Sequence, residues 1–182
     1  MATRLVPSVE EILALPEDGY RHELVFGVHH VSPSPGGPHQ VTVGELFARL
    51  RATCPPEHRV LVAPFAWVVT DPDGGRHEVQ PDLLVVTVDQ AARVRLEDEL
   101  PSLVVEVLSP GAANRARDLE DKFALYQAVG VPAYWVVDRA VPALLTWRLA
   151  EGELRPVAEV ASGESFRTDW PWPVSFRPDD LV

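Results

Sequence analysis

Two acidic residues lie where the sequence otherwise indicates buried apolar strands. Glu106 stands in the middle of the apolar run Leu103–Leu108, and Asp82 opens a second apolar run that ends at Val88. A carboxylate is almost never fully buried unless a cation or a metal ion accompanies it. Each residue alone also has a structural alternative. Glu106 could reach solvent or pair with an arginine, and Asp82 could simply begin a strand or a turn.

The two apolar runs are predicted to form neighbouring strands joined by Gln90–Pro101, so that Asp82 and Glu106 converge at one edge of a sheet. Converging carboxylates repel each other, and a divalent cation or a shared proton relieves that repulsion. Oxygen ligands of this kind suit Mg²⁺ or Mn²⁺. The one cysteine and six histidines show no zinc-type spacing. The pair of acids therefore predicts a magnesium or manganese site.

A third candidate is Lys122, the one lysine among 16 basic residues. Asp118, Lys122 and Tyr126 are spaced four residues apart in the predicted helix Arg115–Val129, so they form one row along it. The helix follows the strand of Glu106 and can pack across the same sheet edge. An ammonium group there would stabilise the negative charge of an attacking water or of a pentavalent phosphate. The alternative is a surface ion pair between Asp118 and Lys122.

The elements that must position these residues indicate an α/β or α+β fold. Near-continuous apolar runs are typical of strands buried on both faces, so we expect a central mixed sheet with helices on each side. The expected strands are Val60–Thr70, Asp82–Val88, Leu103–Leu108 and Val131–Val137, with hairpins at Tyr20–Val31 and Ala143–Val160. The expected helices are Ser8–Ala14, His39–Thr53 and Arg115–Val129, followed by an extended tail at Trp170–Pro173 that packs its aromatic rings on the core.

Length and composition set the remaining limits. A chain of 182 residues that is 46% hydrophobic suits one domain, 1–182, with its own core. One cysteine excludes an internal disulfide framework, and apolar stretches of about ten residues are too short to span a membrane. The N-terminal residues lack an apolar signal core, so we expect a cytoplasmic protein. The net charge of −11 argues against a protein that coats nucleic acid through its overall charge alone.

The candidate residues also occur in a pattern that resembles a known family. The pattern comprises Pro81-Asp82, Glu106–Pro110, Asp118–Lys122 with Tyr126, and Gly130–Asp138. At the N-terminal end it includes Tyr20–Leu24, Gly27, Ser32-Pro33 and His39. Over residues 8–180 the chain is similar to the Uma family of endonucleases, which belongs to the PD-(D/E)XK restriction-endonuclease-like superfamily.

The resemblance implies a restriction-endonuclease-like core, in which helices flank a central mixed sheet and extra hairpins lie at the N- and C-terminal ends. It implies that Asp82, Glu106 and the backbone carbonyl of Val107 bind the metal. By the same resemblance, Leu108 occupies the position of the superfamily's lysine, and Lys122 from the following helix is expected to stand in for it. Glu23 resembles a family-typical residue with no assigned mechanism, and its alternative is a pair with a nearby arginine.

Residues and resemblance together predict an Mg²⁺- or Mn²⁺-dependent endonuclease with DNA as its substrate. Such an enzyme needs metal ligands, a cation near the reacting phosphate and further cations on backbone phosphates. By role, the predicted residues are Asp82, Glu106 and Lys122 for catalysis, Glu23, Asp118 and Tyr126 as accessory groups, and Arg115 and Arg117 for substrate binding. We expect a homodimer, because cutting both strands needs two sites. The alternatives are a catalytically weak or inactive binding or regulatory protein and a metal hydrolase with a non-nucleic substrate.

Overall fold

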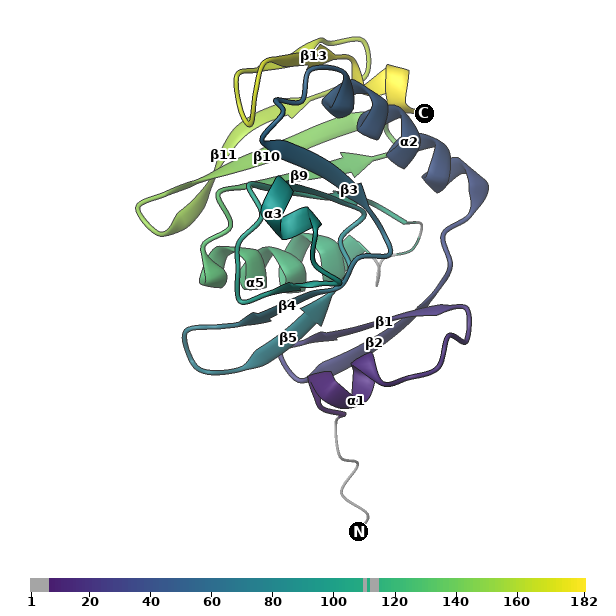
Figure 1. The fold of residues 1–182 in the computed structure, drawn as a ribbon. Helices are drawn as coiled ribbons and strands as arrows, with labels where there is room; N and C mark the ends of the chain where they lie inside the picture. The colour runs from purple at the N-terminus through teal and green to yellow at the C-terminus, as the bar shows by residue number, and fades with distance from the viewer. Residues whose placement is uncertain (1–6, 110, 112–114) are drawn as a thin grey trace.

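The computed structural model describes residues 7–109, 111 and 115–182, and its centre is a six-stranded mixed sheet (Figure 1). In spatial order its strands are β11 (Glu153–Val160), β10 (Ala143–Ala150), β9 (Ala133–Asp138), β8 (Leu103–Val107), β6 (Leu83–Thr87) and β3 (His58–Val62). Strands β8 and β9 run parallel, and the other neighbouring pairs are antiparallel. The three apolar runs predicted as buried strands are β6, β8 and β9, so the mixed α/β fold class is confirmed.

The structure also contains a second sheet, of five strands, whereas the sequence predicts a single sheet with added hairpins. Its strands, in spatial order, are β2 (Val28–Pro33), β1 (Tyr20–Val25), β5 (Arg76–Val79), β4 (Trp67–Thr70) and β7 (Leu96–Glu97). The N-terminal hairpin β1–β2 forms as predicted, with positive φ at Phe26 and Gly27 in its turn. The prediction of one strand-like segment at Val60–Thr70 is wrong, because β3 and β4 belong to different sheets. Pro64, which has no N–H for a ladder, lies between them.

Helices occur close to the predicted positions. They are α1 (Val9–Leu13), α2 (Gly37–Ala52), α3 (Val88–Ala91), the π-helical turn η1 (Arg117–Asp121), α5 (Lys122–Val129) and the C-terminal 3₁₀ turn η2 (Pro178–Leu181). Ser8 caps α1 in a capping box with Glu11, and Gly130 ends α5 with φ of 82°. The predicted continuous α-helix Arg115–Val129 is interrupted by η1. Such wide turns frequently mark functional sites.

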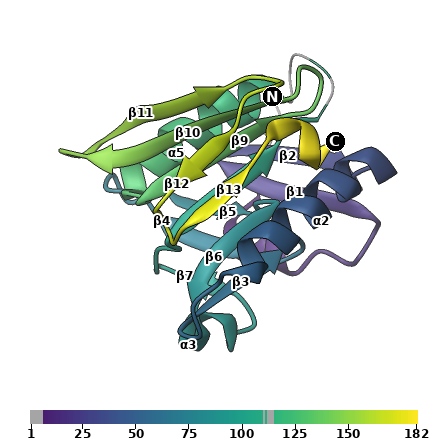
Figure 2. The ribbon, with the colours of Figure 1, turned by 90° about the horizontal axis from the view of Figure 1, so that it is seen from above.

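Different elements cover the two faces of the six-stranded sheet (Figures 1 and 2). Helix α2 and the hairpin of β12 (Phe166–Thr168) and β13 (Val174–Phe176) cover one face, and α5 lies on the other face, between the two sheets. Strand β8 alternates between the two cores: Val105 and Val107 pack towards α2, whereas Val104 packs with α5. Because side chains alternate along a strand, Glu106 faces α5.

Parts of three segments considered in the sequence analysis fall on residues that the structure does not describe. The Glu106–Pro110 motif and the linker after β8 include residues 110 and 112–114, and the N-terminal segment includes residues 1–6, all outside the described residues. In the ranges that are described, no helix has both the length and the apolar character needed to cross a lipid bilayer.

Candidate active site

Asp82 and Glu106 meet at the end of two paired strands. In the antiparallel ladder of β6 and β8, Leu83 lies opposite Val105, so the register continues to Asp82 opposite Glu106 on the same face. The backbone N–H of Val107 donates a 2.8 Å hydrogen bond to Asp82 Oδ2. Both acids line a cavity of about 20 Å³, large enough for one water molecule or one ion. The prediction that these strands are neighbours is confirmed.

Glu106 is a buried carboxylate that accepts two hydrogen bonds from the helix packed on its strand. Its Oε1 lies 2.8 Å from Lys122 Nζ and 2.9 Å from the hydroxyl of Tyr126. Burial raises the pKa of Glu106 to about 7, although the charge of Lys122 acts in the opposite direction. The alternatives of a solvated Glu106 or a pair with an arginine are therefore wrong: its partner is the lysine.

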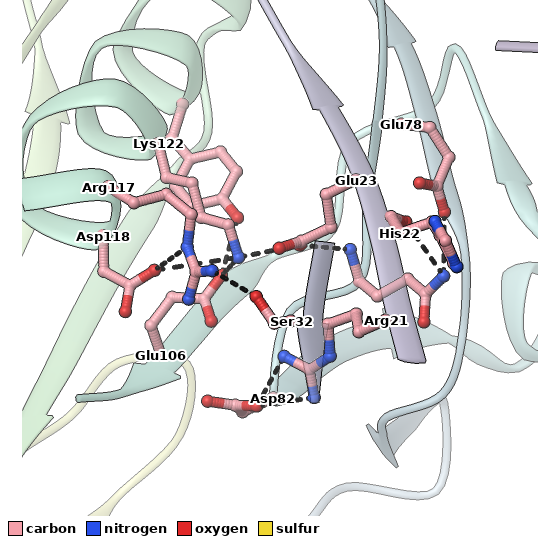
Figure 3. A network of polar contacts seen from close by, with 12 residues as sticks. Arg21, His22, Glu23, Ser32, Glu78, Asp82, Glu106, Arg117, Asp118 and Lys122 are labelled. Carbon is pink, nitrogen blue, oxygen red and sulfur yellow. Dashed lines mark hydrogen bonds and ion pairs between the residues drawn. The ribbon is translucent and has the colours of Figure 1, made fainter. Parts of the chain in front are cut away.

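Lys122 is completely buried and holds three acids around one ammonium group (Figure 3). Its Nζ lies 2.8 Å from Oε1 of Glu106, 2.8 Å from Oε1 of Glu23 and 3.9 Å from Oδ1 of Asp118. Burial alone would lower the pKa of Lys122, but these carboxylates outweigh it and raise the pKa above its usual range. The alternative of a surface Asp118–Lys122 pair is wrong, because the ammonium has no exposed surface. In the predicted row of Asp118, Lys122 and Tyr126, the lysine lies near Asp118, and both Lys122 and Tyr126 contact Glu106.

Glu23 enters the site from β1, in the other sheet. Its Oε1 accepts from Lys122 and also from the backbone N–H of Gln80 at 2.9 Å. Burial opposes ionisation, but the charges of Lys122 and Arg21 lower the pKa of Glu23 below its ordinary value. Sequence reasoning assigned Glu23 no mechanism. In the structure it shares the ammonium of Lys122 with Glu106, so the five-stranded sheet contributes directly to the site.

Asp82 has two partners, Arg21 and His39, that sequence reasoning did not assign. Nη1 and Nη2 of Arg21 each donate to Oδ1 of Asp82 at 3.0 Å, and Nε2 of His39 lies 3.1 Å from Oδ2 (Figure 3 shows the arginine). The same His39 nitrogen lies 3.0 Å from the carbonyl oxygen of Val107. Burial would raise the pKa of Asp82, but His39, Arg21 and the Val107 N–H lower it to about 2. In the sequence, both residues stood in the family-like pattern of Tyr20–Leu24 and His39. That pattern did not indicate that they contact Asp82.

The two arginines predicted to bind substrate lie in different places. Arg117 lines the small cavity, where Nε donates to Asp118 Oδ1 at 3.1 Å and Nη1 donates to Ser32 Oγ at 2.7 Å. Burial raises the pKa of Asp118 against the effect of its cationic neighbours. Arg115 instead pairs with Asp138 and lines a separate cavity of about 450 Å³ next to Ser109. Arg117 therefore belongs to the group around Asp82 and Glu106, and Arg115 lies beyond it.

The donor set around the small cavity fits a hard divalent cation. Asp82 and Glu106 supply carboxylate oxygens and Val107 supplies a carbonyl oxygen, which are the ligand types that Mg²⁺ and Mn²⁺ prefer. Among the residues described, no three or more His, Cys, Asp or Glu side chains already converge as a metal-binding group. The reason is visible in the contacts: Asp82 faces Arg21 and His39, whereas Glu106 faces Lys122 and Tyr126.

Glu78, on β5, is a buried acid beside this network. Its Oε1 accepts from Gln80 Nε2 at 3.1 Å, while its Oε2 is buried and has no partner among the described atoms. Burial raises the pKa of Glu78 to about 7, although the hydrogen bond from Gln80 opposes the shift. The folded protein therefore holds a proton on Glu78 in a pH range where the unfolded chain has released it.

We expect Glu78→Gln to stabilise the protein at pH 8 and to have little effect at pH 4. The folded pKa lies above the unfolded value of 4.5, so wild-type stability is complete below pH 4.5 and falls as the pH rises towards 7. The shift corresponds to about 3 kcal/mol above pH 7. Urea unfolding at pH 4, 6 and 8 measures the difference, with Glu153→Gln on exposed β11 as the control. A difference that does not change with pH would contradict the prediction.

Comparison with known proteins identifies the family of the chain and a structure with a similar fold. The family model Uma2, described as "Putative restriction endonuclease", matches residues 9–171. Among solved structures, the chain is similar to a crystal structure from Anabaena variabilis described as "a putative nuclease belonging to DUF820". That match has a TM-score of 0.68 and 18% sequence identity, and it covers 94% of this chain and 95% of the other. A search of curated proteins found no match.

Proposed function

Because the chain belongs to the Uma2 family of restriction-endonuclease-like proteins, we propose that it is a metal-dependent endonuclease that hydrolyses phosphodiester bonds of DNA. One observation carries the proposal: Asp82, directly before β6, and Glu106, near the end of the adjacent β8, line a cavity of single-ion size, and a buried lysine is bonded to Glu106. The family model spans most of the chain, which favours one nuclease domain over residues 1–182. A cytoplasmic homodimer, with one site for each DNA strand, belongs to the same proposal.

Asp82, Glu106 and the Val107 carbonyl would hold the metal. A bound Mg²⁺ or Mn²⁺ would activate a water molecule and offset charge on the phosphorus. Glu106 and Glu23 hold Lys122 protonated, because both carboxylates raise its pKa. Lys122 donates to Glu106 from behind the cavity that Glu106 lines. In this proposal its positive charge orients Glu106 and stabilises negative charge that develops at the site, and it is unsuited to removing a proton.

The neighbouring side chains have supporting roles in this proposal. Tyr126 donates to the same oxygen of Glu106 as Lys122 does, so it fixes the carboxylate against the helix. Arg117 lines the cavity and is the better placed of the two predicted arginines to hold a backbone phosphate. Asp118 orients Arg117 through a 3.1 Å contact. Arg115 would contact DNA farther along the strand, beside Asp138.

A nuclease-fold binding protein with little catalysis is the second candidate function. Two observations favour it. Arg21 and His39 cover Asp82, and Leu108 packs into the core at the position where the superfamily carries its lysine. Plasmid cleavage in Mn²⁺ separates the candidates, since only the endonuclease nicks DNA at a rate that depends on Glu106.

Mn²⁺ should raise the melting temperature of the wild type and leave that of Asp82→Asn unchanged. A ligand that binds only the folded state stabilises it by about 2.7 kcal/mol at a hundred times its dissociation constant. For a chain of this size that corresponds to a shift of roughly 5–10 °C. Calorimetry measures the shift, with Asp89→Asn on exposed α3 as the matched control. A shift of equal size in wild type and Asp82→Asn would place the ion elsewhere.

A further inference from the structure

Every hydrogen-bonding position of the Asp82 carboxylate is taken by a donor of the chain itself. Oδ1 receives both terminal nitrogens of Arg21 at 3.0 Å, and Oδ2 receives the Val107 N–H at 2.8 Å and His39 Nε2 at 3.1 Å. His39 Nε2 also lies 3.0 Å from the Val107 carbonyl oxygen. Both Asp82 oxygens and the Val107 carbonyl oxygen, all proposed as metal ligands, are therefore in contact with groups of the chain itself.

Arg21 and a divalent ion cannot share Oδ1 of Asp82. Arginine keeps its proton at any ordinary pH, so its positive charge remains and would repel the ion at contact distance. The Val107 N–H belongs to the last residue of β8, and its hydrogen bond keeps Oδ2 occupied. Oδ1 is thus the oxygen that an ion would take, and Arg21 is the group that must leave.

Open space lies next to the Arg21 side chain. Its side chain is 14% exposed, and it lies at the boundary between the small cavity and a second, larger groove of about 670 Å³. Exposed residues such as Tyr20 and Leu15 line that groove. A rotation of the Arg21 side chain from Asp82 into the groove keeps β1 in place, because only side-chain torsions change.

We propose that Arg21 is a substrate-binding residue that pairs with Asp82 while no metal is bound. A divalent ion at Asp82 displaces the guanidinium of Arg21, which then binds a phosphate of the DNA at the mouth of the groove. The planar fork that now holds one carboxylate oxygen matches a phosphate equally well. The exchange couples metal binding to substrate binding through one side chain. This inference rests on the proposed function, because it requires a metal at Asp82.

The test uses Mn²⁺ alone and then a short DNA duplex in saturating Ca²⁺, with Arg21→Gln compared to wild type and to Arg155→Gln on exposed β11. Calorimetry should show Mn²⁺ binding to Arg21→Gln about 10- to 100-fold more tightly, the factor expected if Arg21 leaves Asp82 in about 1–10% of metal-free molecules. In Ca²⁺, Arg21→Gln should bind the duplex about 10-fold more weakly, because a charge-assisted contact is lost. Arg155→Gln should match wild type in both measurements.

The outcomes separate this inference from the proposed function. Equal or weaker Mn²⁺ affinity in Arg21→Gln, with normal binding by wild type, would overturn the inference and leave the metal site intact. Tighter Mn²⁺ binding with unchanged duplex affinity would overturn the phosphate contact. Failure of both wild type and Arg21→Gln to bind Mn²⁺ would remove the proposed function itself. If Arg21→Gln does not fold, Arg21→Lys decides, since it keeps a cation on Asp82 but should still lose duplex affinity.

Discussion

Glu106→Gln should abolish plasmid nicking in Mn²⁺ while the protein remains folded. The change keeps the shape of the side chain and removes the charge that the metal and Lys122 both require. Losing several kcal/mol of transition-state stabilisation lowers the rate on the order of a thousandfold. The measurement is the rate of conversion of supercoiled to nicked plasmid, with circular dichroism as the folding control.

Stability should not fall in the same variant. Burial disfavours the charged form of Glu106 and raises its pKa to about 7, so removing the charge relieves a cost at pH 8. Lys122 keeps Glu23 as a counter-ion, and the amide oxygen of the new side chain can still accept from Tyr126. We expect an equal or higher free energy of unfolding in urea, with Glu153→Gln as the control. A loss of several kcal/mol would instead identify Glu106 as a member of a structural ion pair.

Lys122→Met should remove both activity and stability. The ammonium is completely buried between Glu23 and Glu106, so its loss leaves two carboxylates without their cation. Breaking a buried pair in this way costs about 3–5 kcal/mol. Chemical denaturation at pH 8 measures the loss, and plasmid nicking measures the activity.

Two further variants separate the roles of Lys122. The double variant Lys122→Met with Glu23→Gln removes one of the stranded charges, so it should regain part of the stability without regaining activity. Lys122→Arg keeps the charge but places a larger, planar group in a closed space, and overpacking costs about 1–3 kcal/mol. We expect Lys122→Arg to lose most activity as well. Nicking at the wild-type rate by folded Lys122→Met would take Lys122 out of the mechanism.

Local patterns in the sequence determined the individual elements and the principal acids. Apolar runs predicted β6, β8 and β9, and the spacing of turn residues predicted both long hairpins. Glu106 was conspicuous because a charge in an apolar run conflicts with burial, and Lys122 because lysine occurs once. These signals are local, since each depends on a residue and its near neighbours along the chain.

Contacts between distant segments were decided only by the tertiary structure. Arg21 and His39 reach Asp82 across 61 and 43 residues of sequence, and no local periodicity encodes which strand edge they meet. The split of Val60–Thr70 between two sheets likewise depends on which core each half packs against. The same holds for Arg115, which pairs with Asp138, and for Lys122, whose burial depends on β1 closing over α5 with Glu23. An amphipathic pattern indicates that a side is buried, whereas the partner that buries it is set by packing of the whole chain.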